Sequence, residues 1–360
     1  MLNQQTLNRP AEFSGIGLHS GNRVNMTILP APANSGVRFR RVDLEGKPEI
    51  EARVENVADT TRSTSLAKGN VKIHTVEHVL AALAGYGIDK SSVSRQWKAA
   101  TAAELQKLVQ RPVPADLVAL LIDGQYFRKE CLIVALGVDK QGQKHVLGLW
   151  HGATENSTLV RELLADLRER GLNTEAAILV VLDGAKALYK GVREVFGERA
   201  LIQRCRVHKL RNVLEHLPLE KRQQAAWRLR GAWAKPTAEE ALRELRGCVK
   251  WLDTISPNAA RSLEEGLEET LTITRLGLHE SLVRTFSSTN LIESCFARTE
   301  SWTGRVKRWR NARMVMHWGA AALLFAEKGF RRVRGYHHLG QLIQALGLNQ
   351  SELASMKKAA

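Results

Sequence analysis

Two aspartates occupy matching positions in the sequence, each directly after a run of apolar residues. Asp123 follows the run Asp116–Ile122, Asp183 follows the run Ala177–Leu182, and a glycine comes after each aspartate. For either Asp-Gly pair alone, an ordinary turn is the better interpretation. Two such pairs after two predicted strands instead favour a site in which both carboxylates meet at one edge of a sheet.

A third carboxylate is available at Glu293, early in a predicted helix over Ser287–Arg298 that Ser288 or Thr289 can cap. A glutamate in this position commonly does no more than interact with the helix dipole. Three carboxylates, however, suit two hard divalent cations such as Mg²⁺ or Mn²⁺ about 3.5–4 Å apart. Such cations serve phosphodiester cleavage and strand transfer, so the residues predict phosphoryl-transfer chemistry without a cysteine or histidine ligand.

The predicted elements around these residues follow one another in a definite order. Three strand candidates come first, and helices then alternate with strands: Asp116–Ile122, Cys131–Val138 and Lys144–Trp150, then helix Ser157–Arg170, strand Ala177–Leu182, helix Ala185–Phe196, strand Ala200–Gln203 and a helix from Cys205. This order fits an RNase H-like α/β layer, in which the first and fourth strands lie side by side. The fold class that we predict is therefore α/β, with Asp123 and Asp183 at the carboxyl ends of adjacent strands.

The remaining segments differ in character from this layer. From Leu210 to about His279 the pattern is helical, and its tryptophans Trp227, Trp233 and Trp251 are predicted to be core residues rather than DNA-stacking groups. We predict an incomplete α+β fragment at 1–89, a linker with the remnant of a helix-turn-helix at 90–114, the RNase H-like core at 115–214 and 281–335, an all-α insertion at 215–280 and a C-terminal tail at 336–360.

Positive charge is concentrated in the C-terminal part of the chain. The net charge is +16, and residues 1–90 hold 11 Lys/Arg against 9 Asp/Glu, which leaves +14 for the remaining 270 residues. This excess favours a nucleic acid partner over a basic surface that only confers solubility. The stretch Arg298–Arg334 holds ten Lys/Arg with Trp302 and Trp309 among them, although a merely solvated face is the alternative. The candidate DNA contacts are Arg305, Lys307, Arg308 and Arg310 here, with Lys209 and Arg211 upstream.

The cysteines and the hydropathy pattern bear on the compartment. The four cysteines are dispersed without a CxxC pair, no run of 18 apolar residues exists, and the N-terminus lacks a signal pattern. We therefore expect a cytoplasmic protein that has no membrane segment.

Three segments resemble the Mutator-type transposases of bacterial insertion sequences: Leu121–Tyr126 (LIDGQY), Leu182–Asn212 and Ser288–Glu293 (STNLIE). The resemblance runs from about Ser91 to the C-terminus. It implies a DNA transposase of the Asp/Asp/Glu (DDE) type that uses two Mg²⁺ or Mn²⁺ ions. It also implies that the metal-binding catalytic residues are Asp123, Asp183 and Glu293.

The same resemblance implies roles for residues near the second aspartate. Cys205 and His208 match a Cys-x2-His element of that family and would support the active site, on a helix with Lys209 and Arg211. Taken alone, the pair is half of a zinc site, so direct metal ligation is disfavoured. The implied partner is DNA, on which we expect the chain to form a homo-oligomer.

The first 89 residues resemble a different family, the UDP-3-O-acyl-N-acetylglucosamine deacetylases of lipid A synthesis, in segments such as Gln5–Gly21 and Thr75–Asp89. By this resemblance His78 is a zinc ligand, Glu77 a general base and His19 an active-site histidine. That family takes its other zinc ligands from a His-x3-Asp element, and none of the 11 histidines here is followed four positions later by aspartate. Zinc at His78 is therefore disfavoured, because one histidine does not make a three-ligand site.

The sequence thus predicts a fusion of a truncated deacetylase to a transposase near Asp89–Ser91. Three functional classes compete: a metal-dependent transposase that is impaired by the loss of its N-terminal DNA-end-binding region, a zinc deacetylase, and an inactive fusion product. We favour the first, because the second lacks its ligand set.

Overall fold

The computed structural model describes residues 6–17, 21–32, 35–60, 63–85, 90–127, 130–152, 156–304, 306, 309 and 311–347. The chain divides into two compact units, Met1–Ala102 and Ala103–Ala360, and each is described by itself. Helix α2 (Lys90–Gln110) begins in the first unit and ends in the second.

The first unit is built from short antiparallel strand pairs and one helix. Its elements are β1 (Ala11–Ile16), β2 (Arg23–Ile28), β3 (Arg38–Arg40), β4 (Glu49–Glu51), η1 (Val54–Asn56), β5 (Val57–Asp59), β6 (Ser65–Lys68), β7 (Val71–Ile73) and α1 (Val76–Gly85). Its fully buried core consists of Ile50, Leu66 and Val76, whereas Phe13 and Ile16 of β1 are 54% and 78% exposed. The described residues of this unit therefore bury little apolar surface.

The second unit contains a mixed sheet with the strand order β10-β9-β8-β11-β12. The strands are β8 (Leu117–Phe127), β9 (Glu130–Asp139), β10 (Lys144–Gly152), β11 (Ile178–Leu182) and β12 (Ala200–Arg204). Strands β8, β9 and β10 pair antiparallel, and β11 pairs parallel with both β8 and β12. All five predicted strands are confirmed, and so is the adjacency of the first and fourth.

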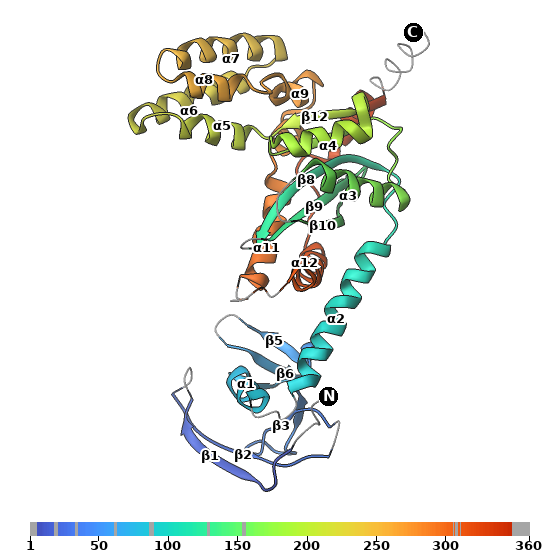
Figure 1. Ribbon diagram of the computed structural model, residues 1–360, viewed down its shortest axis with the longest axis vertical. Coiled ribbons are helices and arrows are strands. Elements are labelled where there is room, and N and C mark those ends of the chain that lie inside the picture. Colours follow the sequence, from blue (N-terminus) through green and yellow to red (C-terminus); the bar gives the residue numbers. More distant parts are fainter. Residues whose placement is uncertain are drawn as a thin grey trace. The chain divides into compact units, whose positions relative to one another are not determined.

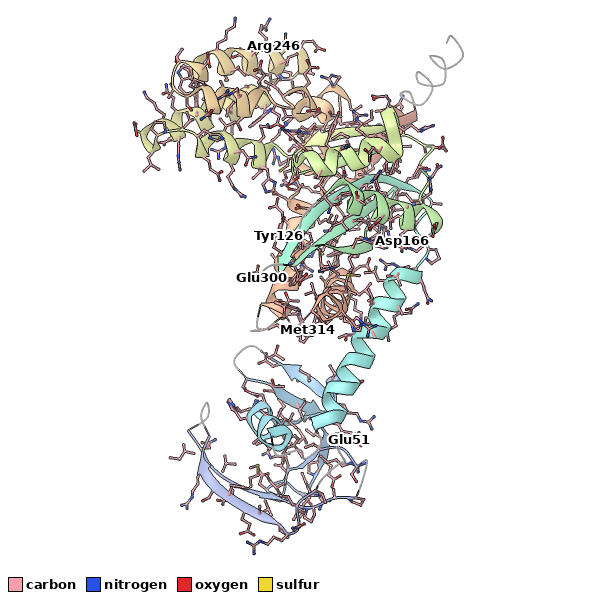
Figure 2. All side chains as sticks on the ribbon, in the orientation of Figure 1. Glu51, Tyr126, Asp166, Arg246, Glu300 and Met314 are labelled. Atoms are coloured by element: carbon pink, nitrogen blue, oxygen red, sulfur yellow. The ribbon has the colours of Figure 1, made fainter. Side chains whose placement is uncertain are left out.

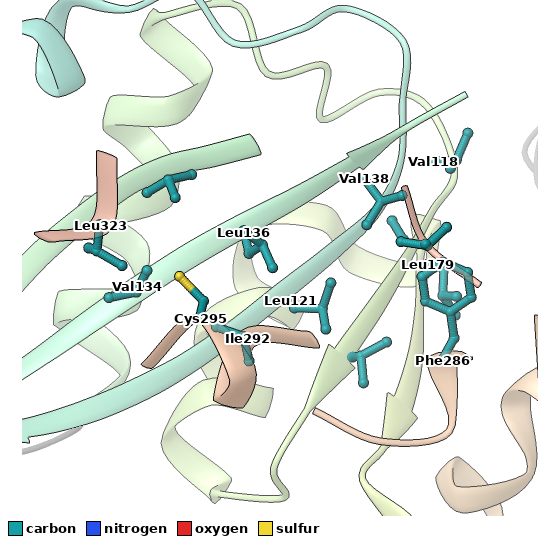
Figure 3. Packing of buried hydrophobic residues seen from close by; sticks show 14 of the residues in the cluster. Val118, Leu121, Val134, Leu136, Val138, Leu179, Phe286, Ile292, Cys295 and Leu323 are labelled. Carbon is teal, nitrogen blue, oxygen red and sulfur yellow. The ribbon is translucent and has the colours of Figure 1, made fainter. Parts of the chain in front are cut away.

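Helices cover both faces of this sheet (Figure 1). Helices α3 (Ser157–Glu169) and α4 (Lys186–Phe196), with η2 (Gly197–Arg199) after them, form a core on one face. The other face carries α10 (Glu280–Phe286), α11 (Asn290–Thr303) and α12 (Ala312–Glu327), followed by η4 (Tyr336–His338) and a helix over 339–347. Figure 3 shows Ile292 and Cys295 of α11 packed over Leu121 and Val134 of the sheet.

A helical subdomain lies between β12 and α10 in the sequence. It contains α5 (Arg206–Glu215), α6 (Leu219–Trp233), α7 (Ala238–Asp253), α8 (Pro257–Glu264), η3 (Glu268–Leu271) and α9 (Thr272–Arg275) around its own core. The buried Gln203 side chain ties it to the sheet, because its amide donates to Thr270 O at 3.0 Å and accepts from Ile273 N at 2.9 Å.

Candidate functional site

The two aspartates are aligned on neighbouring parallel strands. The register pairs Leu182 with Ile122, so Asp183 and Asp123 come next on β11 and β8, whose separation is about 4.8 Å. Side chains alternate between the two faces: Leu121 and Val181 belong to the core under α11, and Ile122 and Leu182 to the core under α3. Within β8 this alternation puts Asp123 on the α11 face, and Asp183 directly follows the end of β11.

Local hydrogen bonds orient each carboxylate. Asp123 is 7% exposed, and its Oδ1 accepts from the main-chain N of Gly124 at 2.9 Å. Asp183 Oδ1 accepts from Ala185 N at 2.8 Å. Between these last two residues Gly184 has φ +110°, a conformation that glycine adopts without strain, and the chain turns there into α4.

The predicted position of Asp123 at the end of its strand was wrong. Strand β8 continues to Phe127, and its ladder with β9 extends to the pair Phe127–Glu130. The ladder with β11, in contrast, stops at Ile122. Asp123 is therefore the first residue of β8 beyond its parallel neighbour, and the apolar run could not reveal this because β9 supports the strand further.

The third carboxylate comes from the helix that covers the same face. Thr299 of α11 accepts a hydrogen bond from Gln125 of β8 at 3.0 Å, so α11 follows β8 past Asp123. Figure 2 shows the next residues along these elements, Tyr126 and Glu300, at the same end of the sheet. Glu293 lies in the first turn of α11, and its side chain is 35% exposed.

Of the two predicted capping residues of α11, Ser288 accepts a hydrogen bond from a main-chain N–H of the first turn, that of Asn290, at 3.5 Å. Thr289 is the N-cap residue, but its side chain makes no cap hydrogen bond. The buried hydroxyl donates instead to Glu293 Oε1 at 2.6 Å. Sequence patterns missed this contact, because they assign an N-cap hydroxyl to a main-chain N–H of the first turn.

Cys205 and His208 lie against Glu293. Among the described residues, one group of His, Cys, Asp or Glu side chains has donor atoms within 4.8 Å of one another, and it consists of Cys205, His208 and Glu293. Cys205 is the N-cap residue of α5, and its Sγ accepts from His208 N and Thr289 N, each at 3.4 Å. Cys205 and His208 were expected beside the predicted acidic cluster, and the structure brings them close to Glu293, whereas Asp123 and Asp183 do not belong to this group.

The electrostatics of this group favour a charged pair. Hydrogen bonding to Cys205 raises the pKa of His208 to about 9, although burial lowers it. The negative charges of Glu293 and Asp123 also raise this pKa. Burial by itself would raise the pKa of the Cys205 thiol, but the hydrogen bonds from His208 and Thr289 outweigh it and lower that pKa. The direct contact of the imidazole is with Glu293, whose Oε1 lies 3.8 Å from His208 Nδ1.

Only part of the predicted basic surface falls within the described residues. Arg305, Lys307, Arg308 and Arg310 lie outside them, and Arg211 is exposed on α5. Lys209 is buried, and its Nζ donates to Ser262 O and Glu265 O, each at 2.6 Å. Burial, with the nearby Arg204, lowers the pKa of Lys209 to about 8.

The assignment of Lys209 to DNA was therefore wrong, since its ammonium group fixes α5 to α8. A signal for this was present in the sequence. Lys209 lies four residues before Val213, on the buried stripe of α5 that also includes Leu210.

A hollow of about 710 Å³ lies on the surface of the helical subdomain, between α5 and α6. Its lining includes Leu214, Arg222, Trp227 and Arg230. Trp227 is 76% exposed, so its predicted core position was wrong, whereas the predicted burial of Trp233 is confirmed at 7%. Both residues lie on α6, and only Trp233 faces the core of the subdomain.

Charge is divided within the helical subdomain. Residues 206–235, which hold α5 and α6, carry eight Lys/Arg against two Glu, a net charge of +6. Residues 238–271, from α7 to η3, carry four Lys/Arg against eight Asp/Glu, a net charge of −4. The half that contains the hollow and borders Cys205 is thus the half that attracts anions.

Comparison with known proteins decides the family. The family model described as "Transposase, Mutator family" matches residues 53–317, which is more than half of the chain. The chain belongs to the Mutator family of transposases. Its sheet, its helical subdomain and all the described candidate site residues from Asp123 to Glu293 lie inside the matched range.

A second family model, described as UDP-3-O-acyl N-acetylglycosamine deacetylase, matches residues 4–97. The chain is 53% identical over 93 residues to the UDP-3-O-acyl-N-acetylglucosamine deacetylase of Methylococcus capsulatus, which is 26% of this chain and 31% of that protein. The corresponding enzyme of Cellvibrio japonicus is 50% identical over the same length. The chain spans about a third of the length of these relatives.

The predicted fusion is therefore confirmed: a deacetylase-like segment is joined to a Mutator-family transposase. The two matched ranges overlap over residues 53–97, so the transposase match begins earlier than the motifs after Ser91 suggested. The junction near Asp89 stays a prediction.

The deacetylase-like segment contains the predicted relic residues. Glu77 Oε2 accepts from Thr64 N at 2.8 Å, and the His78 side chain is 67% exposed. A hydrogen bond of 2.8 Å joins His74 Nδ1 to Ser65 Oγ. His19 lies outside the described residues.

Family membership implies DNA as the partner of the transposase part and a divalent metal ion as its cofactor. Among the described helices, none is long and apolar enough to cross a lipid bilayer.

Proposed function

We propose that this chain is a DDE transposase that catalyses metal-dependent DNA strand cleavage and strand transfer at Asp123, Asp183 and Glu293. One observation supports the proposal: Asp123 lies on β8 just past its last pair with β11, Asp183 directly follows β11, and α11, which bears Glu293, packs on this sheet. Three carboxylates brought together repel one another unless cations are bound, so the arrangement suits a site for two Mg²⁺ or Mn²⁺ ions.

The topology supports an RNase H-like fold for the catalytic part. The central strand of the sheet is β8, which comes first of the five in the sequence. On one side it pairs antiparallel with β9, beyond which lies β10, and on the other it pairs parallel with β11, beyond which lies β12. The helical subdomain separates Asp183 from Glu293 in the sequence, and α11 then returns across the sheet to the aspartates.

The bound cations would supply charge neutralisation at the phosphate and activation of a water molecule or a 3′ hydroxyl. The protein's own groups hold the carboxylates in place. Main-chain N–H groups of Gly124 and Ala185 orient Asp123 and Asp183, and Thr289 orients Glu293. The protonated His208 adds a positive charge beside Glu293, where a DNA phosphate would approach.

The α5–α6 face of the helical subdomain is the proposed DNA surface that the structure describes. It belongs to the segment 206–235, whose net charge of +6 includes the buried Lys209, and it exposes Trp227 between Arg222 and Arg230. Arginines neutralise backbone phosphates, and an exposed indole stacks on unpaired bases. This face, together with Arg305, Lys307, Arg308 and Arg310, would guide DNA to the carboxylates. A homo-oligomer of the chain would assemble on the bound DNA.

The second candidate function, zinc-dependent deacetylation by the N-terminal segment, is not favoured. The chain spans about a third of the deacetylases that it matches, and within the described residues His78 belongs to no group that could hold a metal ion. We propose that this segment has no deacetylase activity.

A cleavage and strand-transfer assay tests the proposed function. The purified full chain is incubated with labelled DNA and Mg²⁺ or Mn²⁺, and the products are compared with those of Asp183→Asn and Asp123→Asn. Asp253→Asn, an exposed carboxylate of α7, is the matched control. We expect metal-dependent products from the parent chain and the control, and a loss of at least a hundredfold in the two site variants. Equal activity of Asp183→Asn and the parent chain would contradict the proposed site.

A further inference from the structure

The Cys205, His208 and Glu293 side chains offer one sulfur, one nitrogen and one oxygen donor to a common point. These donor atoms lie within 4.8 Å of one another. In a tetrahedral zinc site, bonds of about 2.0–2.3 Å separate the donors by about 3.4–3.8 Å. The group therefore needs to contract by roughly 1 Å, which side-chain rotations of His208 and the partly exposed Glu293 can supply.

We propose that Cys205, His208 and Glu293 form a binding site for a thiophilic divalent cation of the Zn²⁺ class, which shares only Glu293 with the proposed all-oxygen site. Three protein ligands leave a fourth position for water, as in open zinc sites. Thiolate and imidazole donors select Zn²⁺ over Mg²⁺, which prefers oxygen ligands.

The scaffold around the sulfur suits a bound cation. Cys205 is the N-cap residue of α5 and His208 follows one turn later, so one short segment fixes both ligands. The Sγ atom accepts from two main-chain N–H groups, those of His208 and Thr289. Such hydrogen bonds stabilise a thiolate and orient it, as the surroundings of structural metal ligands do.

The hydroxyl of Thr289 lies at the centre of the three donors. Its Oγ1 is 3.3 Å from Cys205 Sγ, 3.3 Å from His208 Nδ1 and 2.6 Å from Glu293 Oε1. A hydroxyl has one proton and can donate it to one of these acceptors at a time. A cation beside this hydroxyl would be coordinated by all three donors, and the threonine side chain would rotate to make room for it.

The consequence for activity rests on the proposed function, whereas the binding itself does not. Glu293 would belong to both sites, so Zn²⁺ held by Cys205 and His208 would withdraw Glu293 from the catalytic carboxylates. Zn²⁺ would then inhibit cleavage that Mg²⁺ supports. The site would make the transposase sensitive to free zinc.

Titration of the metal-free full chain with Co²⁺ tests the binding site directly. A cobalt–thiolate bond gives a near-ultraviolet charge-transfer band, which we expect to saturate at one Co²⁺ per chain and to disappear when Zn²⁺ is added. Cys205→Ala should abolish the band, and His208→Asn should weaken Co²⁺ binding at least tenfold. Cys248→Ala and Cys295→Ala, which replace other buried cysteines, should retain it.

The outcomes separate this inference from the proposed function. A parent chain without the band, or a Cys205→Ala variant that keeps it, would overturn the zinc site. If Cys205→Ala does not fold, as judged by circular dichroism, His208→Asn decides alone. Mg²⁺-dependent cleavage without a cobalt band would leave the proposed function intact, and a cobalt band without cleavage would leave only the zinc site. Where both occur, Zn²⁺ should inhibit cleavage at the concentrations that displace Co²⁺, and uninhibited cleavage there would refute the shared role of Glu293.

Discussion

Replacing Thr289 by valine removes the hydroxyl that donates to Glu293, together with its longer contacts to Cys205 Sγ and His208 Nδ1 at 3.3 Å. The two side chains have nearly the same shape, and residue 289 is fully buried, so the packing of α11 is retained. Hydrogen bonds to charged groups contribute about 1.5–3 kcal/mol. Because the Glu293 side chain is 35% exposed, water can replace part of the bond, and the lower value of about 1.5 kcal/mol applies. Since 1.36 kcal/mol corresponds to a factor of ten, we expect about a tenfold effect.

The effect should appear in metal-dependent cleavage, either as a slower maximal rate or as a higher Mg²⁺ concentration at half-maximal rate. Measuring the rate over a range of Mg²⁺ concentrations separates these two forms. Thr289→Ser keeps the hydroxyl and should stay within about threefold of the parent chain. Thr303→Val is the matched control, because this buried hydroxyl of α11 bonds only to Thr299 O. A Thr289→Val variant with an unchanged rate and unchanged Mg²⁺ dependence would refute the positioning role of Thr289.

Further expected results concern other parts of the second unit. Trp227→Ala should lower DNA affinity at least about fivefold while Trp227→Phe retains it, as measured by fluorescence anisotropy, and affinity of the parent chain should fall steeply with salt. The folded Lys209 loses its proton near pH 8 and the unfolded one near pH 10.5, so the unfolded state binds more protons between these values. In urea unfolding, the stability of the parent chain relative to Lys209→Met should therefore rise across this window, by at most about 1.4 kcal/mol per pH unit. Burial raises the pKa of Cys295 to about 12, so iodoacetamide should not alkylate it in the folded chain.

Much of the sheet could be predicted because its strands are apolar on both faces. Continuous runs such as Ile178–Leu182 are typical of strands that helices cover on both sides, and β8, β9 and β11 are all of this kind. The order of strands and helices then left few topologies, and the adjacency of β8 and β11 followed from it. The fusion was equally accessible, because its two parts carry separate sequence motifs.

Side-chain contacts between distant segments were less accessible. Lys209 was predicted to bind DNA because a charged side chain is usually exposed. Its ammonium group instead donates hydrogen bonds to main-chain carbonyl oxygens of α8 and of the turn that follows it. Trp227 looked like a core residue because large aromatic residues are usually buried, but Trp233 occupies the core side of α6. Thr289 could not be linked to Cys205, since 84 residues separate them and only the docked subdomain brings them together.

The position of Asp123 within β8 explains how the site can be both rigid and accessible. On one side, Asp123 pairs with Val134 of β9, and that ladder continues for four more residues, so the main chain around the carboxylate is fixed on both flanks. On the other side, the ladder with β11 has already stopped at Ile122. Beyond Ile122, the edge of β8 that faced β11 is no longer paired with it. Asp183 follows the end of β11, and Cys205 and His208 follow the end of the neighbouring β12. A carboxylate held on a strand keeps its position better than one on a loop, and a DNA phosphate that enters from this side would meet Asp123, Asp183 and the His208 cation together.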